Sequence, residues 1–133
     1  MKKIIATITQ TPEFSPEDIN DIIVGALEGG INYWCRKAVI KRNEFTDDYF
    51  GVAKEDQDKV EFASDVIGYG GTLILYDAET TDKWELTLEN VLKAIELHCT
   101  NIGRSLSDLM DSYDASDSDA IVQYAIFGEQ VFA

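Results

Sequence analysis

Residues 15–30 read SPEDINDIIVGALEGG, and this stretch decides the fold class because it encodes one complete helix. Ser15 is a favoured N-cap, Pro16 suits the first helical position, and the acids that follow stabilise a helix N-terminus. Apolar residues then recur at helical spacing, at Ile19, Ile22, Ile23, Ala26 and Leu27. Glycines 29 and 30 end the helix, because glycine readily adopts the left-handed cap conformation.

Strand-like segments flank this helix. Residues 2–10 (KKIIATITQ) are short and β-branched, and residues 31–42 (INYWCRKAVIKR) are rich in aromatic and β-branched side chains. Both patterns predict strands. In the second strand, alternation places Asn32, Trp34 and Arg36 on one face and Tyr33 on the other.

The middle of the chain predicts a hairpin followed by a helix. Residues 60–67 favour a short helix that the glycines at 68, 70 and 71 end. Residues 72–76 (TLILY) and 83–86 (KWEL) form the two strands, with DAETTD as the turn. Thr87 caps the next helix, Gly103 ends it, and its apolar stripe comprises Leu88, Val91, Leu92, Ile95, Cys99 and Ile102.

The last third is acidic and predicts a loop before a final helix. Residues 105–119 are polar, with a helical turn near 106–110. Asp117 or Ser118 is the expected cap of a helix that carries Ile121 and Val122 and that Gly128 closes. The tail, residues 129–133, is expected to add a short edge strand.

The order of these elements predicts one α+β domain over residues 1–133. We expect a mixed sheet of about four strands with three to four helices mainly on one face. Residues 43–58 and 105–118 are the loop-like parts. No apolar run approaches the length of a membrane span, and no signal-peptide pattern precedes the domain, so the sequence predicts a cytoplasmic protein.

Charge is the unusual property of the composition. The chain has 25 acidic and 11 basic residues, which gives a formal net charge of −14. Neither residues 11–35 nor residues 105–133 contain a single Lys or Arg, whereas Arg36, Lys37, Lys41 and Arg42 form a local basic cluster. Such a field repels phosphate backbones and anionic membranes and attracts basic surfaces.

The spacing of the candidate residues does not match the sequence patterns of catalytic, metal-binding or phosphate-binding sites. His98 and Cys99 are adjacent on a helix and therefore point about 100° apart, so they cannot form a dyad. The acids of residues 108–117 recur every three residues without the alternation and glycine of a calcium loop. The glycines at 68–71 precede a strand, whereas a phosphate-binding loop follows one. We therefore predict a protein that is not an enzyme, with no catalytic residues, metal or cofactor.

Two segments instead suit recognition. The first places Asn32, Tyr33, Trp34 and Arg36 directly after the helix end, and Trp and Arg are favoured at binding hot spots. The glycine turn at Gly70 and Gly71 permits close backbone approach. The second segment is the last helix, in which Gln123, Tyr124 and Phe127 lie off the apolar stripe and are candidate contact residues. The expected acidic surface comprises Asp108, Asp111, Asp114, Asp117 and Asp119. A buried role is the alternative for either aromatic residue at 33 and 34.

The runs ALEGGINYWCR, GGTLILYDAE, KWELTLENVLKAIE and SDAIVQYAIFGE resemble a group of short hypothetical proteins carried by bacteriophages and prophages. The likeness spans the chain except residues 43–58 and 105–116. It transfers no catalytic residues. It implies a phage-encoded protein that acts in the bacterial cytoplasm.

Three hypotheses follow. In the leading one, a non-enzymatic phage accessory protein counters host defence, as anti-CRISPR inhibitors do, by binding a basic, nucleic-acid-binding effector through its acidic surface. In the main alternative, it sequesters a cyclic-nucleotide immune signal in an aromatic and arginine pocket. A minor virion or assembly role is the third. Homo-oligomers are expected, because small proteins with exposed aromatic strands often pair.

Overall fold

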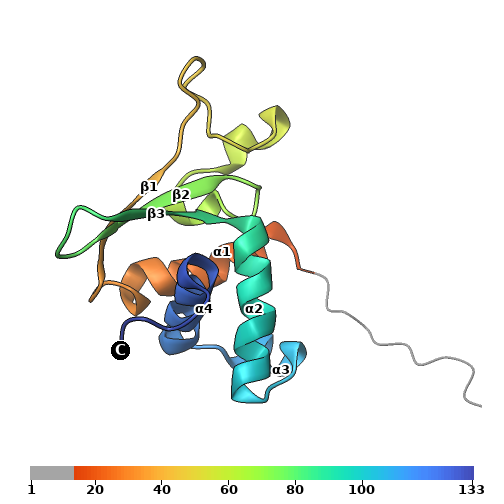
Figure 1. Ribbon diagram of the computed structural model, residues 1–133. Helices are drawn as coiled ribbons and strands as arrows, with labels where there is room; N and C mark the ends of the chain where they lie inside the picture. Colours follow the sequence, from red (N-terminus) through yellow and green to blue (C-terminus); the bar gives the residue numbers. More distant parts are fainter. Residues whose placement is uncertain (1–13) are drawn as a thin grey trace, which may run out of the picture.

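The computed structural model describes residues 14–133, which form a sheet covered mainly on one face by helices (Figure 1). The sheet has three strands in the order β1-β2-β3, at Cys35–Ile40, Thr72–Asp77 and Lys83–Thr87. The four α-helices are α1 (Pro16–Gly25), α2 (Leu88–Ile102), α3 (Leu106–Ser112) and α4 (Ala115–Phe127). The predicted α+β single domain is confirmed.

The sheet differs from the prediction in strand number and direction. Both strand pairs of the described residues are antiparallel, so this sheet is not mixed, and it has three strands where about four were expected. The hairpin of β2 and β3 is confirmed, with Leu73 paired to Leu86 and Leu75 to Trp84. The strand predicted over residues 2–10 lies outside the described residues.

The first strand begins later than the sequence predicts. Helix α1 continues as the π-helical turn η1 (Ala26–Gly30), and a further turn follows in which the backbone N–H groups of Trp34 and Cys35 donate to the carbonyl of Ile31. Residues 31–34 are therefore not a strand, and β-type alternation does not apply to them. The expectation that Asn32, Trp34 and Arg36 share a face is wrong: Trp34 is 2% exposed, whereas Asn32 and Arg36 are exposed.

The two helices predicted from caps and stripes are confirmed. Ser15 caps α1 in a reciprocal capping box with Asp18, and Thr87 caps α2, which ends at Gly103 in the left-handed conformation. The buried stripe of α2 is rotated from the predicted one. Leu92 and Ile102 are exposed, and the face that packs on the core comprises Val91, Ala94, Ile95, His98 and Cys99.

The acidic segment 105–118 is mostly helical, which corrects the predicted loop, and the helical turn predicted near residues 106–110 is confirmed as part of α3. Ser105 caps α3, and Asp114 caps α4 in a capping box with Asp117. The last helix therefore begins at Ala115, earlier than the predicted caps at Asp117 or Ser118. The three-residue spacing of acids, which looked like a solvated linker, is in part the spacing between an N-cap and the third helical position.

Helix α4 lies at the centre of the molecule, between α1, α2 and the sheet (Figure 1). Residues 118–123 are all buried, including Gln123 at 0% exposure, so this helix has no solvent-facing stripe over these residues. Its close packing on α1 requires a glycine, because a side chain at Gly25 would meet the hydroxyl of Ser118 at 2.7 Å.

Two shorter elements also differ from the prediction. The helix expected over residues 60–67 is reduced to the single 3-10 turn η3 (Ala63–Asp65), and a second 3-10 turn, η2, occupies Lys54–Lys59. The tail over residues 129–133 forms no strand and packs against Trp34 through Phe132. Within residues 14–133, none of the helices has both the length and the apolar character needed to cross a membrane.

Replacing Gly68 tests how closely the loop before β2 packs on α1. The Gly68 N–H donates to the Asn20 side chain (2.8 Å), and a methyl group there would meet the Pro16 carbonyl oxygen and, at 2.6 Å, Asn20 Oδ1. Backbone cannot move aside easily, so we expect Gly68→Ala to lower the free energy of unfolding by about 2–3 kcal/mol.

Urea denaturation measures this change, and Gly29→Ala is the matched control. Gly29 has an extended φ of 177° and open space where a Cβ would lie, so its substitution should change stability by less than about 0.5 kcal/mol. Equal stability of both variants would contradict the close packing.

Candidate functional site

A buried carboxylate joins two segments that are far apart in the sequence, the turn after η1 and helix α4. Asp119 in α4 accepts hydrogen bonds from the Tyr33 hydroxyl (2.6 Å), the Trp34 indole N–H (2.8 Å) and the Gln123 amide (2.9 Å). It is 9% exposed. The three donors offset much of the free-energy cost of burying a carboxylate, and the two from Tyr33 and Trp34 hold the turn after η1 against α4.

Gln123 extends this network to the tail. Its side-chain oxygen accepts from the backbone N–H groups of Val131 (2.7 Å) and Phe132 (2.8 Å), and its amide donates to the Phe132 carbonyl (3.2 Å). The ring of Phe132 then stacks on Trp34, with centroids 5.1 Å apart and planes within 5°. Trp84 and Phe127 complete this aromatic cluster.

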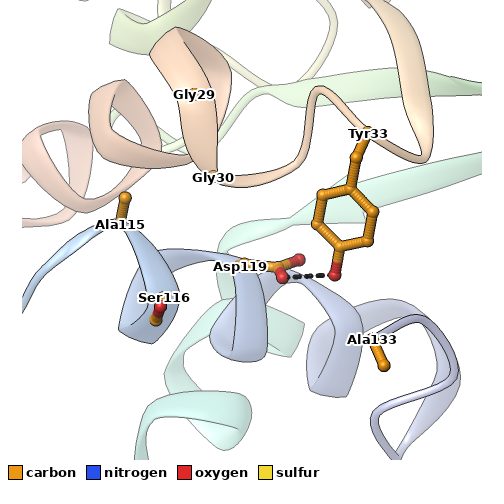
Figure 2. A pocket seen from close by; sticks show the side chains of 7 residues that line it. All are labelled: Gly29, Gly30, Tyr33, Ala115, Ser116, Asp119 and Ala133. Atoms are coloured by element: carbon orange, nitrogen blue, oxygen red, sulfur yellow. Dashed lines mark hydrogen bonds between the residues drawn. The ribbon is translucent and has the colours of Figure 1, made fainter.

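Two cavities lie beside Tyr33. The larger, of about 420 Å³, lies between the end of η1 and the first turns of α4, and Figure 2 shows Asp119 and the Tyr33 hydroxyl bonded together at its lining. Its lining residues are Gly29, Gly30, Tyr33, Ala115, Ser116, Asp119 and Ala133. The smaller, of about 220 Å³, lies between Tyr33, Phe132 and the β2–β3 turn. Tyr33 itself is 52% exposed, so it is reachable from solvent.

The local potential around Tyr33 is negative. Burial of the hydroxyl, together with the hydrogen bond to Asp119 and the charge of that carboxylate, raises the pKa of Tyr33 to about 12. The β2–β3 turn adds a second ordered carboxylate, because Asp77 accepts from the N–H groups of Glu79 (2.7 Å) and Thr80 (2.8 Å), which lower its pKa. Acceptors therefore dominate the polar groups near Tyr33.

The structure brings together only part of the predicted recognition set. Tyr33, Trp34 and Gln123 meet in one network, with Phe127 in the adjoining aromatic cluster. Trp34, Gln123 and Phe127 act there as packing and positioning groups, whereas Tyr33 lines both cavities beside it with a well-exposed side chain.

Asn32 and Arg36 line a different cavity, of about 180 Å³, with Leu27 and Cys35. The Arg36 guanidinium lies over the Tyr76 ring, 5.2 Å from its centroid. Arg36 thus contributes to the strand surface and not to the Tyr33 site.

Gly70 and Gly71 pack tightly against another part of the chain. A Cβ on Gly71 would clash with Val66 and, at 2.9 Å, with Val52, and Gly70 faces Gly51. These glycines serve loop packing, so the structure does not assemble the nucleotide pocket predicted from Tyr33, Trp34, Arg36 and the glycine turn. The sequestration hypothesis stays a prediction.

Tyr124 faces α2 and not the Tyr33 site. Its hydroxyl accepts from the Asn101 side chain (3.0 Å), and its ring lies 6.0 Å from that of His98. It is partly buried, so its contribution to a partner surface is small.

The five acids of the predicted acidic surface differ in how far they are buried. Asp108, Asp111 and Asp114 are exposed, as expected. Asp117 is partly buried, and Asp119 is buried and belongs to the Tyr33 network, so its placement on the surface was wrong.

The side chains of Cys35, Cys99 and His98 are buried. Burial raises the pKa of both Cys35 and Cys99, which disfavours the reactive thiolate. His98 bonds through Nε2 to Asp117 (2.8 Å). Burial alone would raise the pKa of Asp117, but its bonds with His98 and the Asp114 backbone hold that pKa below its ordinary value. In the part of the chain that the structure describes, no three acidic, Cys or His side chains gather to hold a metal ion.

The chain matches no protein-family model, no curated protein and no solved structure.

Sequence reasoning missed Asp119 as a structural centre and Phe132 as a core residue. The i, i+4 spacing of Asp119 and Gln123 inside an apolar run was a usable signal, because polar residues there need partners. Nothing in the sequence indicated that the partners would be Tyr33, Trp34 and the tail.

Removing the Asp119 carboxylate should unfold part of this network. Asp119→Ala leaves the buried Trp34 N–H and one N–H of the Gln123 amide without an acceptor, so we expect a loss of about 2–4 kcal/mol in the free energy of unfolding. Urea denaturation measures it. Asp111→Ala, at an exposed acid, is the control and should stay within about 0.5 kcal/mol of the wild type.

The raised pKa of Tyr33 predicts an alkaline loss of stability. The phenol is neutral in both states below pH 10, and between pH 10 and 12 it ionises in the unfolded chain but resists ionisation when folded. The stabilisation from Tyr33 is therefore complete below pH 10 and declines as pH rises toward 12. Ultraviolet titration of wild type minus Tyr33→Phe should show one tyrosine that titrates near 12. A difference curve centred at 10 would contradict the assignment.

Proposed function

We propose that this chain is a non-catalytic binding protein whose acidic helical surface docks on a basic, nucleic-acid-binding surface of a bacterial defence protein. The observation that carries the proposal is the packing together of the two segments that lack Lys and Arg. Residues 14–35 contain α1, η1 and the turn that follows η1. Residues 105–133 contain α3, α4 and the tail, and α4 packs against both α1 and η1.

Acidic side chains from both segments reach the surface. The exposed ones are Glu17, Asp21, Glu28, Asp108, Asp111, Asp114 and Glu129. Tyr113, in the link between α3 and α4, lies close enough to α1 to be affected by the charges of that helix. Burial is the main cause of its raised pKa, and the charges of Asp21 and Asp18 on α1 add to it.

Most basic residues of the described chain lie elsewhere and are engaged. Arg104 is the exception, because its guanidinium donates to the Asp108 carbonyl (2.7 Å) and to the Ser112 hydroxyl on α3. Ion pairs join Lys41 to Glu85 (2.7 Å), Lys59 to Asp56 (2.9 Å) and Lys93 to Glu89 (3.2 Å). Arg36 and Lys37 lie over the Tyr76 ring on the sheet. The molecule is therefore electrically asymmetric, with its excess negative charge on the helical side.

Charge complementarity explains the choice of partner. Surfaces that bind nucleic acid carry clustered Lys and Arg side chains that neutralise phosphates. A dense acidic surface offers these side chains the same negative charge that phosphates carry. Such complementarity accelerates association and selects the partner. The bacterial defence context comes from the resemblance of four sequence segments to phage and prophage proteins.

A charge-neutralising triple variant tests this surface. Asp21→Asn, Glu28→Gln and Asp111→Asn remove three exposed acids from the helical side that make no side-chain hydrogen bond among the described residues. Affinity capture from bacterial lysate, quantified by mass spectrometry, should retain nucleic-acid-binding proteins at low salt and lose them at high salt or on addition of duplex DNA. The triple variant should bind the retained protein about tenfold more weakly.

The control carries the same net charge. Glu44→Gln, Glu55→Gln and Glu61→Gln remove three exposed acids from the region between β1 and β2. Its affinity should stay within about threefold of the wild type. Affinity that is insensitive to salt, or equal losses in both variants, would overturn the proposed surface.

A further inference from the structure

We infer that the 420 Å³ cavity beside Asp119 receives one cationic side chain of the partner, an arginine guanidinium. This inference rests on the proposed function, because it names the group that the acidic surface would capture. The cavity lies at the seam of the two base-free segments, and every residue that lines it comes from one of them (Figure 2).

Asp119 is a buried carboxylate without a cationic partner. Acids are seldom buried this deeply unless a positive group pairs with them. Among the described residues no Lys, Arg or His forms an ion pair with Asp119; its partners are the neutral donors of Tyr33, Trp34 and Gln123. No cationic side chain of the described residues therefore offsets this carboxylate at the lining of the cavity.

One oxygen of this carboxylate has capacity for another donor. Oδ1 accepts from both Trp34 and Gln123, whereas Oδ2 accepts only from the Tyr33 hydroxyl. Each carboxylate oxygen can accept two hydrogen bonds, so Oδ2 has one acceptor position left. A guanidinium N–H from the cavity side would complete it.

The other walls suit a planar cation. Tyr33 offers an aromatic ring, and guanidinium groups stack on such rings and pair with carboxylates more readily than ammonium groups do. Gly29, Gly30, Ala115 and Ser116 are small, so the approach is open.

An anionic ligand is disfavoured at the same place. It would face the Asp119 carboxylate, and two further acids lie at the start of the same helix, Asp114 as its N-cap and Asp117 in its first turn. The Asp114 side chain already accepts from the Asp117 N–H (3.0 Å), so part of the positive helix end is occupied.

A variant with a large side chain in the cavity lining tests whether the cavity binds the guanidinium. Ser116→Trp places a large ring at an exposed position of the cavity lining, in the first turn of α4. Ser107→Trp places the same ring at an exposed position in the first turn of α3, outside the lining, and is the matched control. The indole N–H resonance of Trp34, bonded to Asp119, reports in both variants that the site is still formed.

The probe is N-acetyl-arginine amide, and its neutral isostere N-acetyl-citrulline amide is the comparison. In ¹H–¹⁵N spectra of the full chain, the arginine probe should shift the Gly29, Gly30 and Ser116 amides and the Trp34 indole. The citrulline probe should bind at least about tenfold more weakly, as expected when charge carries the interaction. Ser116→Trp should lose the shifts, and Ser107→Trp should keep them.

Two results would overturn the inference: equal shifts from both probes, or arginine-induced shifts that leave the cavity amides unmoved. Because the probe assay needs no partner protein, it separates the two proposals. If the triple charge variant loses the partner while Ser116→Trp keeps full affinity, the acidic surface stands and the arginine site fails. If the arginine probe binds in the cavity but capture is insensitive to salt, the proposed function fails.

Discussion

The Asp119 carboxylate accepts hydrogen bonds from three neutral donors, and the arrangement of the helical side depends on this one group. The indole of Trp34 brings the turn after η1 against α4, and Gln123 carries the same network into the tail. Trp34 can then act as the centre of an aromatic cluster with Trp84, Phe127 and Phe132. A carboxylate in the interior thus organises the apolar packing around it, because the hydrogen bonds that it accepts fix the position of the Trp34 ring. The bonds of Gln123 to the tail fix the position of the Phe132 ring in the same way.

Local signals were sufficient for the elements whose ends are marked by caps. Ser15, Thr87, Gly103 and Gly128 each ended or began a helix where the sequence predicted it, since a cap is read from a few adjacent residues. The β2–β3 hairpin was predictable for the same reason.

The errors arose where tertiary contacts override local preference. Residues 31–34 have strand-forming side chains, yet the continuation of η1 and the burial of Trp34 impose a turn. Gln123 looked like a contact residue because it lies off the apolar stripe of α4, but residues 118–123 of that helix are buried on all sides. The acids at 114 and 117 looked like a linker, although each is also a good capping residue. The site itself joins residues 33, 119 and 132, and no sequence pattern indicates a juxtaposition over such separations.

The aromatic cluster has a practical consequence. The chain has two tryptophans, and both belong to the cluster, with ring centroids 5.9 Å apart. Intrinsic fluorescence therefore reports on one place only. Trp34 is stacked on the tail residue Phe132, so an event that lifts the tail or admits water beside Tyr33 would move the emission to longer wavelength. The protein carries its own optical reporter for the region where the two base-free segments meet.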